Sequence, residues 1–252
     1  MTYLLSNTWE QAGERLRLLE ECHDPGTTRR IGQLGLRPGA RCLDVGAGAG
    51  SIARWLAGIG PVIAADADPG LLAPTPGVEV RRTDVVTDPL PGGFDLVFTR
   101  LLLMHLPERD AVLDKLVAAA APGGVVLVED FDFHAMSATA TGAFGQALPA
   151  FLDAQRSRGA VTDLGRYLPA LLDERGLLDV QAEVDLPLVR GGSPIARFIS
   201  LSVAQLTPVA VSRGADPAVL GAARADLDDP GRWFHGPAMV AAWGRRPERS
   251  WP

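Results

Sequence analysis

The sequence predicts a doubly wound α/β fold, with a mostly parallel sheet of seven strands and helices on both faces. From residue 36 onward, short apolar segments alternate with segments of helical periodicity, which is typical of a parallel sheet. A glycine-rich turn at residues 46–50 follows the first of these apolar segments and opens a helical one. Acidic residues mark the ends of three successive strands, where such sheets bind their ligands.

The first 35 residues are expected to form a helical cap. Apolar residues recur at helical spacing over 9–19, Pro25-Gly26 is expected to interrupt the helix, and a second short helix runs to Leu34. Residues 36–131 then form the cofactor-binding half of the α/β domain. Its expected strands cover residues 40–45, 61–65, 78–82, 94–99 and 125–128, with helices at 51–57 and 107–120.

The remainder of the chain is expected to complete the sheet and to cover its ligand. Residues 132–160 are interpreted as an insertion that forms a lid over the substrate. Residues 161–252 supply the rest of the α/β domain, with a helical insertion at about 190–230. Within them the expected elements are a helix at 162–175 and strands at 177–188 and 238–244.

The composition bounds the partners of the chain. Its 252 residues carry a net charge of −6, whereas a general nucleic-acid binder needs a basic face. The N-terminal residues do not read as a signal peptide, and no charge-free stretch of eighteen apolar residues occurs, so we expect a cytoplasmic protein without a membrane partner. Cys22 and Cys42 show neither a disulfide framework nor metal-ligand spacing and are expected to be free thiols, and no metal is expected.

The glycine turn favours one of two cofactor classes. Its spacing is G-x-G-x-G, so the third glycine is Gly50. In a dinucleotide site the third small residue would come one position later, at Ser51. Asp44 precedes the first glycine by two positions. A carboxylate so close to the turn repels a pyrophosphate but suits a ligand that carries an ammonium and a sulfonium. The charge therefore favours S-adenosylmethionine.

Two further acids extend this prediction. Asp66 ends the second strand, about 20 residues after the first turn, where an acid can accept from both ribose hydroxyls. Asp84 follows the third strand, where a short side chain can accept from an adenine amino group. Each acid alone reads as a solvated turn residue, but the three in register indicate a ligand-binding crevice.

With these residues in place, the chain resembles the class I S-adenosylmethionine-dependent methyltransferases. The resemblance covers residues 36–130 and rests on Leu43–Gly50, Val62–Asp66, Thr83–Val85, Leu103–Pro107 and Ala121–Gly124. It implies that the glycine turn faces the methionine and ribose, that Asp66 faces the ribose, and that Asp84 with Val85 faces the adenine. The backbone at Arg100 would meet the methionine amine. The cofactor-binding set is Asp44, Gly46, Ala47, Gly48, Ser51, Asp66, Ala67, Asp84, Val85 and Arg100.

Catalytic candidates are fewer. His134 follows the fifth strand near the expected substrate mouth and is the first choice as a general base, with a polar surface residue as the alternative. His105 belongs to a recurrent motif of the family and is expected to be structural, beneath the cofactor. Trp9 and Arg15 either close over the cofactor or only pack their helix. His235 is expected near the surface, and His23 carries no functional signal.

The predicted function is methyl transfer to an oxygen, nitrogen or carbon of a small molecule, of a kind found in secondary metabolism. One alternative is an enzyme that binds S-adenosylmethionine but catalyses a cyclisation or an elimination. Another is a non-catalytic binding protein. The expected partner is a small-molecule methyl acceptor, and both a monomer and a homodimer are compatible with the sequence.

Overall fold

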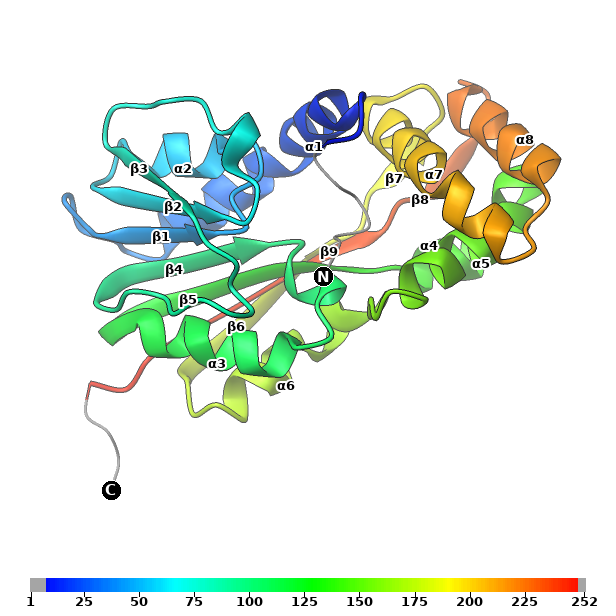
Figure 1. Ribbon diagram of the computed structural model, residues 1–252. Helices are drawn as coiled ribbons and strands as arrows, with labels where there is room; N and C mark the ends of the chain where they lie inside the picture. Colours follow the sequence, from blue (N-terminus) through cyan, green and yellow to red (C-terminus); the bar gives the residue numbers. More distant parts are fainter. Residues whose placement is uncertain (1–7, 249–252) are drawn as a thin grey trace.

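A central seven-stranded sheet organises residues 8–248, which the computed structural model describes (Figure 1). The strand order is β3-β2-β1-β4-β5-β9-β6, and β9 alone runs antiparallel to its neighbours β5 and β6. The predicted fold class is confirmed. The strands are β1 (Cys42–Val45), β2 (Val62–Asp66), β3 (Val78–Arg82), β4 (Phe94–Arg100), β5 (Ala120–Asp132), β6 (Leu178–Asp185) and β9 (Ala238–Arg245).

Helices cover both faces because the central strands are apolar on both sides. Cys42 and Leu96 point into a core shared with α1 (Ala12–Gln33) and α2 (Ser51–Leu56). Leu43 and Val97, the next residues along the same strands, point into the opposite core, which contains α3 (Arg109–Ala119) and α6 (Leu168–Asp173). Short 3₁₀ turns lie at η1 (Pro69–Leu71), η2 (Leu103–His105) and η3 (Leu164–Tyr167).

A helical lid stands beyond the carboxyl ends of the parallel strands, on the right of Figure 1. It contains α4 (His134–Thr139), α5 (Gly142–Arg156), α7 (Pro194–Ser212) and α8 (Pro217–Asp228). A two-stranded sheet of β7 (Leu188–Arg190) and β8 (Trp233–His235), which the sequence analysis missed, joins this lid to the main sheet. The helical content expected at 132–160 and 190–230 is therefore present.

The N-terminal segment differs from the prediction, because α1 runs without a break through Pro25. Buried polar contacts hold the C-terminal half of this helix against β5 and β6. Thr27 Oγ1 donates to Glu129 Oε2 over 2.6 Å, and Arg30 Nη1 donates to Glu129 Oε1 over 2.7 Å. Arg30 also pairs with Glu183 and Asp185 of β6. These contacts outweigh the hydrogen bond that a proline removes from a helix.

Smaller differences have local causes. The strand expected at 177–188 is two strands, β6 and β7, separated at Leu186-Pro187, where the proline offers no ladder donor. The helix expected at 162–175 begins as the 3₁₀ turn η3. The fifth strand is longer than residues 125–128, because its end at Asp132 pairs with Ala238 of β9.

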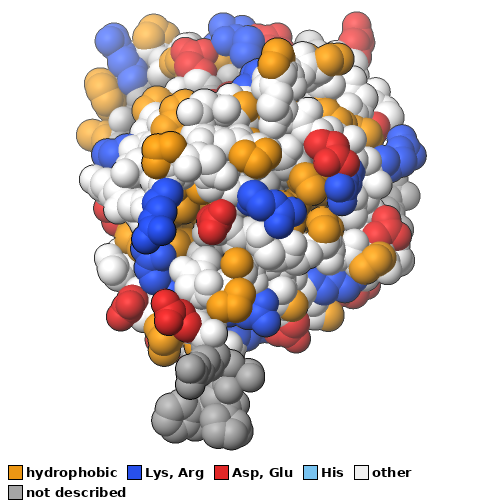
Figure 2. Space-filling view, turned by 90° about the vertical axis from the view of Figure 1, so that its left-hand side faces the viewer, with side chains coloured by type: hydrophobic (Ala, Val, Ile, Leu, Met, Phe, Trp, Pro, Cys, Tyr) orange, Lys and Arg blue, Asp and Glu red, His pale blue; other side chains and the backbone are white. Residues whose placement is uncertain are grey.

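The lid helix α7 is long and apolar enough to cross a membrane by length and composition alone. Within the fold it packs against α1, α5 and α8, and half of its apolar window is buried. That is the pattern of a core helix. On the opposite end of the molecule, away from the lid, basic and acidic side chains are interspersed, and no basic stripe crosses the face that Figure 2 shows.

Candidate active site

A cavity of 520 Å³ lies between the carboxyl ends of the parallel strands and the lid. Its sheet-side wall comes from the ends of β1, β2 and β4, the loops after them and the loop after β3. Helix α1 closes over this wall with Arg15, Leu16, Leu19 and Glu20. Its lid-side wall comes from the end of β5 and from α5 and α7. The lining of the lid-side wall includes Phe131, Phe133, Phe151, Gln155, Phe198, Ile199 and Ser202.

The glycine loop, residues 46–50, forms part of the sheet-side wall. Gly46, Gly48 and Gly50 have φ of 74°, 59° and 81°, a left-handed region that residues with a Cβ rarely adopt. A Cβ on Gly50 would also lie 2.5 Å from Leu72. These positions therefore require glycine, and the loop can bring its backbone close to a ligand.

Asp66 joins this loop to the end of β2. Its Oδ2 accepts from the backbone N–H of Gly48 over 2.9 Å, and its Oδ1 accepts from Asp68 over 2.8 Å. Burial raises the pKa of Asp66, while these two hydrogen bonds act against the rise. The carboxylate thus fixes the loop as well as lining the cavity, a role that the sequence analysis did not foresee.

Asp44 is a buried carboxyl in the sheet-side wall, with 2% of its surface exposed. Burial raises its pKa to about 7; the charge of Asp66 adds to the rise, and the guanidinium of Arg100 opposes it. The Arg100 side chain itself points to α1, where it donates to Asp24 Oδ1 over 2.8 Å and to Thr27 Oγ1 over 2.9 Å. The wall therefore contains a carboxyl whose charge a bound cation would stabilise.

Asp84 combines the two interpretations weighed for it. Its Oδ1 accepts from Val86 N over 3.0 Å, and its own N–H donates to Asp88 Oδ2, which makes it a turn residue. It also lines the cavity, together with Val85. The remaining cofactor candidates Gly46, Ala47, Gly48, Ser51, Asp66, Ala67 and Arg100 line the same cavity, so the structure brings the predicted set together.

His105 lines the cavity from η2. Removal from water, with the nearby Arg15 guanidinium as a second cause, lowers its pKa to about 3, so the imidazole is neutral near pH 7. The buried carboxyl of Asp130 holds this turn, because its Oδ2 accepts from Met104 N over 3.1 Å. Burial raises the pKa of Asp130 to about 8. Leu101, just before η2, has a left-handed φ of 53° that the sequence did not signal.

The structure does not bring His134 to the cavity lining, so the geometry does not support its predicted role as general base. His134 begins α4 with an exposed side chain, and its backbone N–H donates to Asp132 Oδ1. The fifth strand extends to Asp132, and His134, two residues further on, lies outside the cavity lining. His23, to which the sequence analysis gave no function, is buried, and its ring lies 5.4 Å from that of Phe131. His235 is half-buried on β8.

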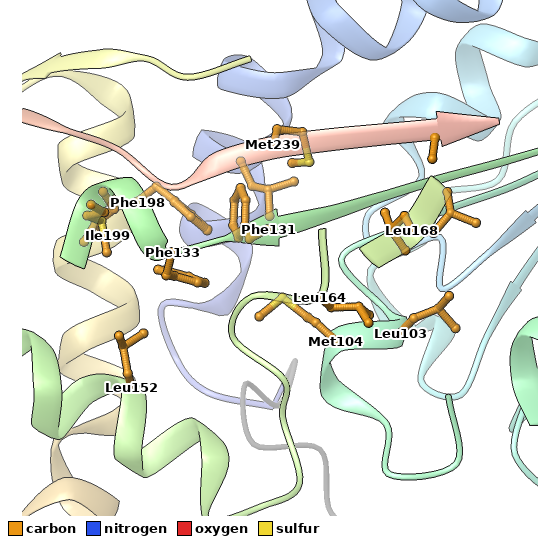
Figure 3. Close-up of a cluster of buried hydrophobic side chains, with 14 of the residues drawn as sticks. Leu103, Met104, Phe131, Phe133, Leu152, Leu164, Leu168, Phe198, Ile199 and Met239 are labelled. Carbon is orange, nitrogen blue, oxygen red and sulfur yellow. The ribbon is translucent and has the colours of Figure 1, made fainter. Parts of the chain in front are cut away.

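Phenylalanine rings dominate the lid-side wall, which sequence reasoning missed entirely. Figure 3 shows Phe131 and Phe133 at the end of β5 beside Phe198 and Ile199 of α7. The Phe131 and Phe133 rings lie 5.5 Å apart, and the Phe133 and Phe151 rings 6.2 Å apart. No periodic pattern links three separate segments, so only the fold reveals this cluster.

The carboxyl groups of the sheet-side wall fit S-adenosylmethionine. Three carboxyl groups, on Asp44, Asp66 and Asp84, surround the glycine loop and suit an ammonium, a sulfonium and sugar hydroxyls. Among residues 8–248, no group of three histidine, cysteine or acidic side chains could hold a metal ion. Cys22 and Cys42 are both free thiols.

Comparisons with known proteins agree with this geometry. A family model described as a methyltransferase domain matches residues 11–177. Methyltransferase str3 of Strobilurus tenacellus is 32% identical over 161 residues, which is 59% of this chain and 57% of that protein. Trans-aconitate 2-methyltransferase of Methylobacterium nodulans is 30% identical over 131 residues, 48% of this chain and 49% of that protein. The chain therefore spans only about half the length of these two relatives.

A similar fold occurs in a solved structure of phosphoethanolamine N-methyltransferase 2 from Haemonchus contortus, in complex with phosphomonomethylethanolamine and S-adenosylhomocysteine. The TM-score is 0.63, with 16% identity over 98% of this chain and 60% of that chain. At this identity the likeness concerns the fold alone.

Proposed function

We propose, on the premise that this chain belongs to the class I S-adenosylmethionine-dependent methyltransferase family, that it methylates a small molecule held beneath the lid helices. The acceptor atom is an oxygen, nitrogen or carbon. Family membership confirms the resemblance noted in the sequence and identifies S-adenosylmethionine as the cofactor. The observation that carries the proposal is one continuous cavity, with carboxylates and a glycine loop on one wall and aromatic rings on the other.

The sheet-side wall would hold the cofactor. Asp66 offers its carboxylate to the ribose, Asp84 and Val85 line the adenine end, and Asp44 is the buried carboxyl available to the methionine ammonium. When bound, the cofactor supplies an electrophilic methyl group on its sulfonium. The contribution of the protein is to align the acceptor with that methyl group and to keep water away.

The lid-side wall would hold the acceptor. The cavity is covered by α5 and α7, so an acceptor must be small enough to lie beneath them. The name of the Methylobacterium nodulans relative also specifies a small acid as its substrate. Both observations support a small-molecule acceptor, and the acidic net charge of the chain argues against nucleic acid.

The imidazole to consider as a base for the proton of the acceptor is that of His105. His105 is the one imidazole that lines the cavity among residues 8–248, and a side chain whose pKa is about 3 takes up a proton poorly at neutral pH. We therefore assign His105 a positioning role, as a neutral hydrogen-bonding group beside the reacting atoms. Alignment then contributes most of the rate.

Methyl-labelled S-adenosylmethionine tests the proposal. The protein is incubated with a cell extract, and the label is followed in the low-molecular-weight, protein and nucleic-acid fractions. We expect label in the first fraction, with one S-adenosylhomocysteine formed per methyl group transferred. Asp66→Ala is the control, because it weakens the cofactor site and leaves the lid intact.

Label in protein or nucleic acid would overturn the small-molecule acceptor. Product formation without S-adenosylhomocysteine would overturn methyl transfer itself and favour a cyclisation or an elimination. Calorimetry adds a separate check: S-adenosylhomocysteine should bind and NAD should not, and the reverse result would contradict the cofactor assignment.

A further inference from the structure

We infer that the lid-side wall takes a planar, uncharged aromatic molecule with a carbonyl or ether oxygen, and that the side-chain amide of Gln155 donates a hydrogen bond to that oxygen. This inference names the class of acceptor and rests on the proposed function. It follows from two independent features of the wall: its aromatic rings and one unpartnered amide.

The aromatic rings come from three elements and converge on the cavity. Phe131 and Phe133 lie at an interplanar angle of 78°, and Phe133 and Phe151 at 62°. The Phe198 ring lies 6.3 Å from that of Phe131. Each ring is at least nine-tenths buried and still lines the cavity (Figure 3). Edges and faces presented at different angles are what a flat aromatic ligand pairs with.

The amide belongs to Gln155, of which 2% is exposed. Its Nε2 is fully buried and has no hydrogen-bond partner among the described residues. An unsatisfied buried donor is costly, so the fold gains nothing from a glutamine here unless something else accepts from it. Gln155 lines the cavity, so the acceptor that we assign to it is a group of the ligand.

Helix geometry places the amide beside the rings. Gln155 follows Phe151 by four residues in α5, so both side chains lie on the same face of the helix. Ser202 and Phe198 stand in the same relation on α7. The Ser202 hydroxyl already donates to the carbonyl of Phe198 over 2.9 Å, which leaves its oxygen able only to accept. Gln155 is thus the donor of this part of the wall.

The charge of the ligand follows from the same surroundings. An amide is neutral, and a carboxylate buried against it among phenylalanine rings would lack a compensating charge. Of the three arginines that line the cavity, Arg15 and Arg100 belong to the sheet-side wall, and Arg158, two residues beyond the end of α5, has an exposed side chain. A neutral oxygen is therefore the better match.

Four other buried polar atoms of the described residues lack a hydrogen-bond partner, and they do not compete for this role. They are His23 Nε2, Arg109 Nε, Asp130 Oδ1 and His235 Nδ1, and none of these residues lines the cavity. Gln155 combines burial, a free donor and a position on the cavity wall.

The test uses two isosteric probes on the protein loaded with S-adenosylhomocysteine. 2-Acetylnaphthalene carries a carbonyl oxygen where 2-isopropenylnaphthalene carries a methylene group, and the two are otherwise alike. We expect the ketone to bind about 2- to 12-fold more tightly in calorimetric or fluorescence titration, which corresponds to one neutral hydrogen bond.

Gln155→Met should abolish this preference and leave the affinity for S-adenosylhomocysteine unchanged. It should also raise the Tm of the ligand-free protein by about 2–4 °C, because it removes an unsatisfied donor. A glutamine with a merely structural role would give a lower Tm. The matched control is Gln181→Met, on an exposed position of β6, which should change neither the preference nor the Tm. Phe151→Leu should weaken both probes by the same factor.

Equal affinity for the two probes, binding of neither, or a lower Tm in Gln155→Met would overturn the inference. Tighter binding of 2-naphthoate than of the ketone would overturn the neutral ligand and point to Arg158. These outcomes are separate from a failure of the proposed function, which shows as loss of S-adenosylhomocysteine binding by the unmodified protein.

Discussion

The two walls of the cavity are built from the sequence in different ways. The sheet-side wall uses residues next to one another at strand ends, such as Asp44 with the glycine loop, and places each by backbone geometry. The lid-side wall gathers Phe131, Phe151 and Phe198 from segments far apart in the chain. A site made of consecutive residues leaves a readable motif, whereas a site assembled from separate helices leaves none.

The walls also differ in how far their polar groups are satisfied. On the sheet side, Asp66 already accepts two backbone hydrogen bonds, so the loop is held before any ligand arrives. On the lid side, the amide nitrogen of Gln155 has no partner. The sheet-side wall is thus preorganised for the cofactor, whereas the lid-side wall holds a hydrogen-bond donor for the acceptor molecule.

The largest expected effect is on the sheet side. Asp66→Ala should weaken S-adenosylhomocysteine binding by about 10- to 150-fold, the equivalent of one hydrogen bond to a charged group at roughly 1.5–3 kcal/mol. The loop also loses its tie to Gly48. Binding of 2-acetylnaphthalene to the free protein should stay unchanged, because the lid is untouched. Unaltered cofactor affinity in calorimetry would remove Asp66 from the ribose site.

A smaller effect should depend on pH. Asp44 has a pKa of about 7, so its carboxyl is protonated and neutral below that pH and charged above it. An ammonium group gains only from the charged form. The affinity for S-adenosylhomocysteine should therefore rise by up to about tenfold per pH unit below pH 7 and level off above about pH 8.

Asp44→Asn should flatten this profile, since an amide does not titrate in this range. A wild-type affinity that does not change between pH 5.5 and about 8 would mean that Asp44 does not meet the ammonium.

The smallest expected effect concerns His134. Because its side chain is exposed and outside the cavity lining, His134→Ala should change stability by less than about 0.5 kcal/mol and leave turnover unaltered. His105→Ala, which removes a group from the cavity, is the comparison and should lower turnover. A loss of about 10²–10⁴-fold in His134→Ala would reinstate it as the base and mean that the lid moves on binding.

The sequence allowed the sheet, the element order and the sheet-side wall to be predicted, because hydrophobic alternation and the glycine spacing are local signals. The break expected at Pro25 was wrong because Arg100, on a distant strand, donates to Asp24 before the proline and to Thr27 after it. The position of His134 was wrong because the end of β5 is fixed by pairing with β9, which follows a hundred residues later in the chain. Gln155 gave no signal, since an isolated glutamine in a helix is ordinary.

The ion pairs of Arg30 have a consequence for how the chain acquires its shape during synthesis. Arg30 precedes its partner Glu183 by 153 residues, so at a ribosomal rate of 5–20 residues per second the partner appears roughly 8–30 s later. Until then the guanidinium has only part of its final surroundings, and α7, against which α1 also packs, follows later still. The strands of the glycine loop can pair long before this. The roof of the cofactor site is therefore among the last parts to settle, although it is translated before the strands that it covers.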